Sequence, residues 1–343
     1  IYDMPLVPEA GGTERITALV AKGLSERGHR CMGILQFNEH SGSMTYGSER
    51  VTDLYSFLKE NKVDVVINQI AYARWLLADF LARGGNRWRS EGGRIISCLH
   101  FDPKNPSLRQ LLASSPVRSI RDRVNLVKAT LMAPLYSRRQ RREEGVVYNF
   151  VYDNSDAFVT LSAAHFPYLK KVMGHGAYDR LTAINNPLTF EEISSVPELD
   201  YKKKVVLVCS RMSEYHKRIS LILKAWRIAK RSPEARDWSL KIVGDGPDLE
   251  RYKRFVAENW LPDVEFFGQQ SPEPYYREAS ILMLASSAEG WGLTLTEGLQ
   301  RGAVPVVMDS SPVFHEIVEH CYNGYLVPNG DVKSMARHVV SLI

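Results

Sequence analysis

The sequence is poor in cysteine and lacks any long apolar run. Its four cysteines are far apart among 343 residues, and no pair has Cys-x-x-Cys spacing, so nothing supports a zinc site. Cys98 and Cys209 lie inside runs of β-forming residues, where a reduced cysteine acts as a small apolar side chain. We therefore expect a reducing compartment, the cytoplasm. No run approaches the 18 apolar residues of a membrane-spanning helix.

The sequence also lacks complete secondary-structure elements at its two ends. No signal peptide is expected before the first element. Residues 1–12 are typical of a strand end that enters a loop, and residues 331–343 stop partway through an amphipathic helical pattern. We expect the chain to be trimmed at both ends.

Acidic residues are scarce in one segment. Between Lys104 and Arg142 there are ten Lys or Arg residues and one acid, Asp122. Apolar residues at helical spacing accompany them, which predicts a segment (residues 104–142) that binds an anionic membrane surface at the inner face of the cytoplasmic membrane. The alternative is a solvated basic helical hairpin. We expect no nucleic acid partner, because no recognition motif accompanies the charge.

Apolar runs alternate with helical patterns along nearly the whole chain, which predicts an α/β protein with two doubly wound parallel sheets. Residues 185–204 are rich in proline, serine and charge and read as a linker. We therefore predict an N-terminal domain over residues 1–188 and a C-terminal domain over residues 189–343. Strands are expected at the following residues: 31–37, 63–70, 94–101, 157–162, 181–185, 204–210, 238–246, 264–269, 280–286, 303–309 and 324–328.

The most informative stretch runs from Glu289 to Val307, where two glutamates separated by seven residues lie between two apolar strands. Gly290 and Gly292 form a turn that enters a helix, and a helix N-terminus with unpaired amides favours an anion. Glu289 and Glu297 are poor partners for phosphate but good acceptors for sugar hydroxyls. The pattern favours a nucleotide diphosphate sugar. The alternative is that Glu289 caps the turn and Glu297 is a solvated helical residue.

Two further segments follow strands in the same half. Arg211 and Lys217 flank a short loop, and two cations there would neutralise a diphosphate, with Ser213 as a helix cap. Basic residues after strands are also common without a ligand. The stretch from Val243 to Tyr252 matches a dinucleotide fingerprint poorly, because Leu249 replaces the third glycine.

Taken together, these segments resemble the retaining glycosyltransferases of family 4, also described as glycosyl transferases group 1, which have the GT-B fold of two Rossmann-like domains. The resemblance rests on Glu289-x7-Glu297, the loop with Arg211 and Lys217, and the stretches 243–252, 264–269 and 323–328. In the first half, residues 11–29 and 157–169 are similar to the family's opening glycine loop with its helix and to its last N-domain strand and helix.

The resemblance implies roles for individual residues. Arg211 and Lys217 would hold the donor diphosphate, and Glu297 would bind the nucleotide ribose. Glu289 would contact the donor sugar, and His100 would lie beside the reacting centre. The remaining donor contacts would come from the glycine loop at Gly12 and from the turn made by Gly290, Gly292, Leu293 and Thr294.

The resemblance also implies a reaction. A sugar moves from a nucleotide diphosphate sugar, with UDP as the expected nucleotide, to a hydroxyl of a glycan or polyprenyl-diphosphate-linked acceptor, as in cell-surface polysaccharide synthesis. Neither a metal nor another cofactor is expected, and no Asp-x-Asp cluster is evident in the expected place. Two alternatives stay open: an epimerase or phosphorylase on the same two-domain plan, and a catalytically silent partner subunit.

Three positions depart from the family pattern, the mildest being Trp291, which replaces a commoner phenylalanine. Pro187 stands where the family usually has glycine, which bears on the geometry of the hinge. Gly298 stands where the family often has alanine, directly after Glu297.

Overall fold

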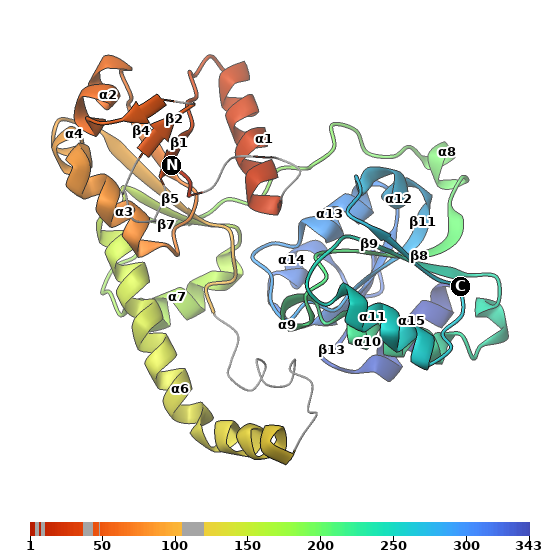
Figure 1. Ribbon diagram of the computed structural model, residues 1–343. Coiled ribbons are helices and arrows are strands. Elements are labelled where there is room, and N and C mark those ends of the chain that lie inside the picture. The colour runs from red at the N-terminus through yellow and green to blue at the C-terminus, as the bar shows by residue number, and fades with distance from the viewer. Residues whose placement is uncertain (4–6, 8–10, 37–43, 48, 105–119) are drawn as a thin grey trace. The chain divides into compact units, whose positions relative to one another are not determined.

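The computed structural model describes residues 1–3, 7, 11–36, 44–47, 49–104 and 120–343 (Figure 1). For residues 120–126, 129, 130, 196 and 197, only the backbone is described. The chain divides into two compact units. One contains Ile1–Asn105 and Leu135–Pro187. The other contains Leu188–Ile343 together with Pro106–Pro134, of which residues 120–134 are described. They are called the first and second unit below.

A six-stranded sheet forms the centre of the second unit, with the strand order β10-β9-β8-β11-β12-β13 and every neighbouring pair parallel. Along β8, Val206 and Val208 pack into one buried cluster, whereas Val205 and Leu207 pack into another. Both faces of this strand are therefore covered, which explains its continuous apolar run. The strands are β8 (Lys203–Cys209), β9 (Ser239–Val243), β10 (Val264–Gly268), β11 (Ala279–Leu284), β12 (Val304–Asp309) and β13 (Tyr325–Pro328).

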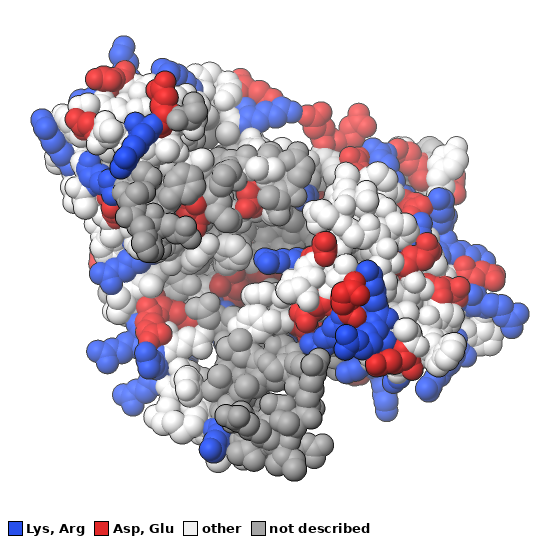
Figure 2. All heavy atoms as spheres, in the orientation of Figure 1, with Lys and Arg blue, Asp and Glu red and all other residues white. Residues whose placement is uncertain are grey.

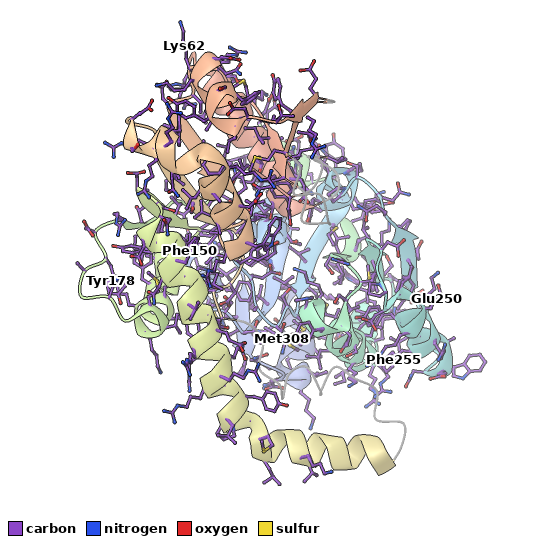
Figure 3. The ribbon with its side chains drawn as sticks, turned by 60° about the vertical axis from the view of Figure 1, so that its left-hand side comes forward. Lys62, Phe150, Tyr178, Glu250, Phe255 and Met308 are labelled. Carbon is purple, nitrogen blue, oxygen red and sulfur yellow. The ribbon has the colours of Figure 1, made fainter. Side chains whose placement is uncertain are left out.

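Helices cover both faces of this sheet (Figure 1). Residues of α10, α11 and α15 join the cluster on one face, which includes Met308 of β12 (labelled in Figure 3), and residues of α12, α13 and α14 join the cluster on the other. On α10, Ile222 and Trp226 lie one turn apart and are buried, as the apolar spacing predicts. The helices are α8 (Val196–Leu199), α9 (Glu214–Lys217), α10 (Ile219–Ala229), α11 (Leu249–Glu258), α12 (Glu273–Glu278), α13 (Leu293–Gln300), α14 (Phe314–Ile317) and α15 (Val332–Leu342).

The first unit contains a four-stranded parallel sheet, β4-β5-β6-β7, and a separate three-stranded antiparallel sheet, β1-β2-β3. The strand expected at residues 31–37 therefore pairs antiparallel with β2, and its link to the chain start is an isolated parallel bridge between Tyr2 and Leu35. The hairpin of β2 and β3 was not predicted, because strands of three residues carry almost no periodic signal. The strands are β1 (Ile34–Gln36), β2 (Met44–Tyr46), β3 (Glu49–Val51), β4 (Val65–Asn68), β5 (Arg94–Leu99), β6 (Ala157–Thr160) and β7 (Leu181–Ala183).

The helices of the first unit include part of one long helix, α6. The basic segment predicted to bind membranes falls partly outside the described residues, at 105–119. Its described remainder belongs to α6, which runs without a turn from Ile120 to Asp153 with Pro134 inside it, so the alternative of a hairpin is wrong for residues 120–142. The other helices are α1 (Gly12–Glu26), α2 (Leu54–Glu60), α3 (Arg74–Phe80), α4 (Asn86–Ser90) and α7 (Phe166–Met173).

Candidate functional site

Most of the predicted donor residues lie in the second unit, at the carboxyl ends of β8 and β11. These strands are neighbours at the middle of the sheet, and the chain order runs outward from them in opposite directions. Such a reversal leaves a crevice beside the strand ends, where ligands bind in doubly wound sheets. Arg211 and Lys217 follow β8, and Glu289 and Gly292 follow β11. The fold thus brings the two predicted segments to one edge.

Lys217 and Glu289 form an ion pair, although 71 residues separate them in the chain. Lys217 ends the short helix α9, and Glu289 lies in the loop before α13. Their side chains are 22% and 17% exposed, so solvent screens this pair less than it screens a surface pair. A lysine ammonium has three N–H donors, so Lys217 can hold Glu289 and still donate to an anion. Arg211 precedes Lys217 by six residues in the sequence, and its side chain is exposed.

Arg218 fixes Lys217 in place. Its backbone is left-handed, with φ 47°, and its guanidinium donates from Nε to the carbonyl of Ala285 at 2.6 Å and from Nη2 to the carbonyl of Ser286 at 2.7 Å. The amide of Ser287 donates back to the carbonyl of His216 at 2.7 Å. The loop after β8 and the loop after β11 are therefore joined on both sides of Lys217. Sequence reasoning missed Arg218, because a left-handed arginine has no signature in one sequence.

The buried carboxylate of Glu214 supports the loop after β8. Glu214 is buried and accepts hydrogen bonds from the Tyr252 hydroxyl, at 3.0 Å, and from Ser220. The amide of Glu214 donates to Asp248 Oδ2 at 2.8 Å, so Asp248 caps α9. The expectation that Ser213 caps this helix is wrong, because its side chain makes no capping bond. The cap comes from a residue distant in sequence, which periodicity cannot show.

The glycines of the stretch from Val243 to Tyr252 serve close backbone packing. Gly244 has φ 126°, and a Cβ atom there would lie 2.0 Å from the carbonyl oxygen of Ser210. A Cβ atom on Gly246 would lie 2.6 Å from the carbonyl oxygen of Met212. Only glycine lets these two backbones approach so closely. The loop that carries Arg211 therefore packs against this turn. The two glycines serve backbone packing, which agrees with the poor match to a dinucleotide fingerprint.

The predicted glycine turn enters α13. Gly292, with φ 106°, is the residue before the helix, and Leu293 is its first residue. Gly290 and Gly292 are buried, whereas Leu293 and Thr294 are partly exposed. The first amides of a helix have no partner within it, and the helix dipole makes this end positive. The four residues predicted as further donor contacts in the turn therefore lie at one helix N-terminus.

Glu297 is buried, with 3% of its surface exposed, so the alternative of a solvated helical residue is wrong. Its carboxylate is a hydrogen-bond partner of the Tyr276 hydroxyl, which also bonds to Thr294. Burial of Tyr276 raises the pKa of its hydroxyl well above the ordinary value, and the nearby Glu297 charge raises it further. The phenol therefore stays protonated near neutral pH.

Gly298 packs directly on the sheet. A Cβ atom at this position would lie 2.7 Å from Leu282 Cδ2, and Leu282 on β11 is fully buried. Leu282 therefore occupies the space that an alanine at position 298 would need, which accounts for this departure from the family pattern. The missing side chain thus lets this part of α13 pack closely on β11.

In the first unit, His100 follows β5, and its Nε2 lies 2.7 Å from Oε1 of Gln69, which follows β4. Its Nδ1 is buried, and no described residue is its hydrogen-bond partner. Burial lowers the pKa of the imidazole to about 4, so His100 is neutral at pH 7. Because Oε1 of Gln69 can only accept, Nε2 of the neutral ring carries the proton, and Nδ1 can accept one further hydrogen bond.

Gly12 is the first residue of α1, not part of a loop. Glu14 lies in the first turn of this helix, is buried, and accepts a hydrogen bond from the Tyr2 hydroxyl at 3.0 Å. Sequence reasoning did not single out Glu14, although an acid in a first helical turn is a recognised signal. Glu14 thus places a carboxylate at the same helix end as Gly12. The phosphate contact of Gly12 stays a prediction.

The buried His100 predicts an acid-dependent loss of stability. The unfolded imidazole takes up its proton near pH 6.5 and the folded one near pH 4, so stability contributed by His100 is complete above pH 6.5 and falls as pH drops toward 4. Between pH 7 and 4.5 we expect wild-type protein to lose about 2–3 kcal/mol more free energy of unfolding than His100→Gln does. Urea unfolding at both pH values measures this difference.

The exposed His29 provides the control, because His29→Gln should keep the wild-type pH dependence. An equal loss of stability in wild type and His100→Gln would contradict the buried, neutral state of His100.

Within the described ranges, no group of three or more His, Cys, Asp or Glu side chains is placed to hold a metal ion.

Comparison with known proteins gives one family match. Residues 189–343 match the family described as Glycosyl transferases group 1. An uncharacterized glycosyltransferase of Haemophilus influenzae is 30% identical over 176 residues, which cover 48% of this chain and 46% of that protein. The lipopolysaccharide 1,6-galactosyltransferase of Escherichia coli is 28% identical over 163 residues, or 46% of this chain and 44% of that protein. The aligned parts thus span about half the length of these relatives.

Solved structures match over more of the chain. The structure of Anabaena HepE in complex with UDP-glucose has a TM-score of 0.66 and 17% identity, and the match covers 99% of this chain and 87% of that one. Staphylococcus aureus TarM has a TM-score of 0.60 and 14% identity, over 89% of this chain and 55% of that one. These likenesses concern the fold, and the predicted GT-B fold class is confirmed.

Proposed function

Residues 189–343 belong to the Glycosyl transferases group 1 family, as the resemblance predicted, and on this premise we propose that the protein is a retaining glycosyltransferase. It moves a sugar from a nucleotide diphosphate sugar, of the UDP-sugar class, to a hydroxyl of a glycan or lipid-linked glycan. The observation that carries the proposal is the Lys217–Glu289 pair beside the N-terminus of α13, with Glu297 buried in the same helix. A known UDP-glucose complex of a protein with the same fold supports the donor class.

The proposed roles follow the chemistry of each side chain. Arg211 and Lys217 bind the diphosphate. The guanidinium of Arg211 donates two parallel N–H bonds, and the ammonium of Lys217 supplies a compact positive charge. The amides at Gly292, Leu293 and Thr294 face the phosphate or the sugar. Glu297 accepts hydrogen bonds from the ribose hydroxyls, and Glu289 orients the donor sugar through its hydroxyls.

The first unit takes the acceptor in this proposal, and residues 1–188 and 189–343 act as acceptor and donor domains. His100 lies beside the reacting centre, and its neutral ring offers Nδ1 to a substrate hydroxyl. Gly12, at the start of α1, approaches the donor phosphate.

The transfer needs no protein nucleophile. The bond between the anomeric carbon and the phosphate oxygen breaks, and the acceptor oxygen forms a new bond to the same face of that carbon. The acceptor proton passes to the departing phosphate oxygen. Charge builds up on this phosphate, and Arg211, Lys217 and the helix N-terminus stabilise it in place of a divalent cation. Exclusion of water favours transfer over hydrolysis.

A donor screen tests the proposal. The protein is incubated with a panel of UDP-, GDP- and ADP-sugars in excess chelator and without acceptor, and free nucleotide and the thermal unfolding midpoint are measured. We expect slow release of UDP from one sugar and a rise of the midpoint with UDP. Release that requires inorganic phosphate would favour a phosphorylase, and conversion to a second nucleotide sugar would favour an epimerase. Neither turnover nor a thermal shift would favour a silent subunit. Activity abolished by chelator and restored by a cation would refute metal independence.

The acceptor is proposed to reside on a lipid at the cytoplasmic membrane surface, to which α6 binds. Described helices are all too short or too polar to cross a membrane. On α6, Val127, Leu131 and Leu135 recur at four-residue spacing and are 59%, 75% and 61% exposed. Exposed arginines follow them at 138, 139, 141 and 142. By contrast, acidic and basic side chains intermingle around the six-stranded sheet of the second unit (Figure 2).

This surface predicts lipid-dependent flotation. Wild-type protein should float with vesicles that contain anionic lipid. Replacing Arg138 and Arg139 with glutamine should weaken binding about 30-fold, because each of the two cations contributes about 1 kcal/mol. Leu131→Gln should weaken it further by removing apolar contact. Ile193→Gln removes a similarly exposed aliphatic side chain from the second unit and is the matched control. Equal flotation with neutral and anionic vesicles would contradict the proposal.

A further inference from the structure

Two exposed aromatic rings stand at the carboxyl edge of the first unit's parallel sheet. Tyr72 follows β4, and Phe101 follows β5 directly after His100. The rings meet edge to face, with centroids 5.2 Å apart and an interplanar angle of 85°. They are 45% and 50% exposed. Exposed apolar side chains that adjoin each other mark interaction or ligand-binding surfaces, whereas isolated exposed rings are common.

A groove of about 600 Å³ opens beside Tyr72. The start of α3 forms one wall of the groove, and Val147 of α6 forms the other. Trp75 is partly exposed and packs its remaining surface against the cluster around Ile70 and Leu76, which holds the indole in place. The lining consists of Tyr72, Ala73, Arg74, Trp75, Ala78 and Val147. Such a wall offers flat apolar faces and one charge.

That charge belongs to Arg74. Its guanidinium carbon lies 4.9 Å from the centre of the Phe150 ring, and Phe150, labelled in Figure 3, lies on α6. The cation–π contact orients the guanidinium but leaves its N–H donors available. Among the described side chains no carboxylate forms an ion pair with Arg74, whose side chain is exposed. An oriented guanidinium without an acid partner is suited to a phosphate or carboxylate.

We propose that this groove binds the acceptor: a sugar that carries a phosphate or a carboxylate group. The C–H face of the sugar packs on Tyr72 and Trp75, as aromatic walls receive apolar surface, and its hydroxyl edge stays in water. Arg74 holds the anionic group. The assignment rests on the proposed function in one respect, that the acceptor's reacting hydroxyl lies near His100, which Phe101 follows in the chain.

Saturation-transfer NMR with three small probes tests the groove. Glucose 1-phosphate carries a phosphate, glucuronic acid carries a carboxylate, and methyl glucoside carries no charge. We expect the wild-type protein to bind at least one anionic probe more tightly than methyl glucoside. Arg74→Gln should remove that preference, a loss on the order of tenfold in affinity for the anionic probe, and leave the neutral sugar unchanged. Tyr72→Ala and Trp75→Ala should weaken binding of charged and neutral sugars alike.

The control is Trp260→Ala, which removes a 91% exposed ring from the second unit and should leave all three affinities unchanged. Binding of UDP, followed by the thermal unfolding midpoint, should be the same in wild type, Tyr72→Ala and Arg74→Gln. Equal binding of the three probes by wild type, or wild-type affinities in all three groove variants, would overturn the proposal. If the wild-type protein does not bind UDP, the donor site is refuted instead. Failure of the groove proposal and failure of the proposed function are therefore distinguishable.

Discussion

Lys217→Ala is expected to lower the rate of sugar transfer about 100- to 1,000-fold, the cost found when one donor to a developing oxyanion is removed. The substitution removes a cation from the leaving diphosphate and leaves Glu289, now without its ion-pair partner, close to the same phosphate. Two negative groups then face each other in a partly buried loop. The rate constant kcat, from UDP release with donor in excess, should account for most of the loss.

Two further variants separate charge from shape. Lys217→Arg keeps the positive charge and should retain more activity than alanine, although a guanidinium does not reproduce the point contact of an ammonium. Lys224→Ala removes an exposed lysine from α10 and should behave as wild type. Wild-type turnover in Lys217→Ala would remove the donor-site assignment.

Glu297→Gln is expected to raise the dissociation constant for UDP by about 10- to 100-fold. Hydrogen bonds to a charged carboxylate contribute about 1.5–3 kcal/mol each, and the amide keeps only part of that interaction with the ribose. The amide oxygen can still accept from the Tyr276 hydroxyl, so the fold and the thermal midpoint of the free protein should change little. Isothermal titration with UDP measures the effect.

A sugar-modified nucleotide shows whether the ribose is the group involved. Wild type should bind 2′-deoxy-UDP more weakly than UDP, and Glu297→Gln should discriminate less between the two. Glu265→Gln removes an exposed carboxylate on β10 and should match wild type. If the variant keeps the full wild-type preference for the ribose, Glu297 does not bind that sugar.

The strands of the second unit were predictable because both faces of the sheet are buried. Residues 204–210 and 280–286 read as largely apolar runs. They overlap β8 and β11 at the centre of the sheet, and each strand begins one residue earlier than predicted. The start of α13 was also predictable, since a glycine turn followed by a helical pattern marks an N-terminus, and Gly292 has the left-handed backbone that such a turn needs.

What single-sequence patterns could not show depends on contacts between distant residues. The buried Glu297 has a hydrogen-bond partner in Tyr276, 21 residues away, and the cap on α9 comes from Asp248, 34 residues from Glu214. The antiparallel hairpin β2–β3 is too short to have a period. Lys217 and Glu289 were assigned to different parts of the donor, and spacing could not reveal that they contact each other.

Arg218 and Ser287 join the two loops through hydrogen bonds that the chain makes to itself. A nucleotide that arrives at these strand ends therefore meets a surface already assembled, and little backbone must become ordered on contact. Association should then be limited by diffusion and by attraction to Arg211 and Lys217. Ionic strength, not the time needed for a loop to open, would determine how quickly the nucleotide is captured.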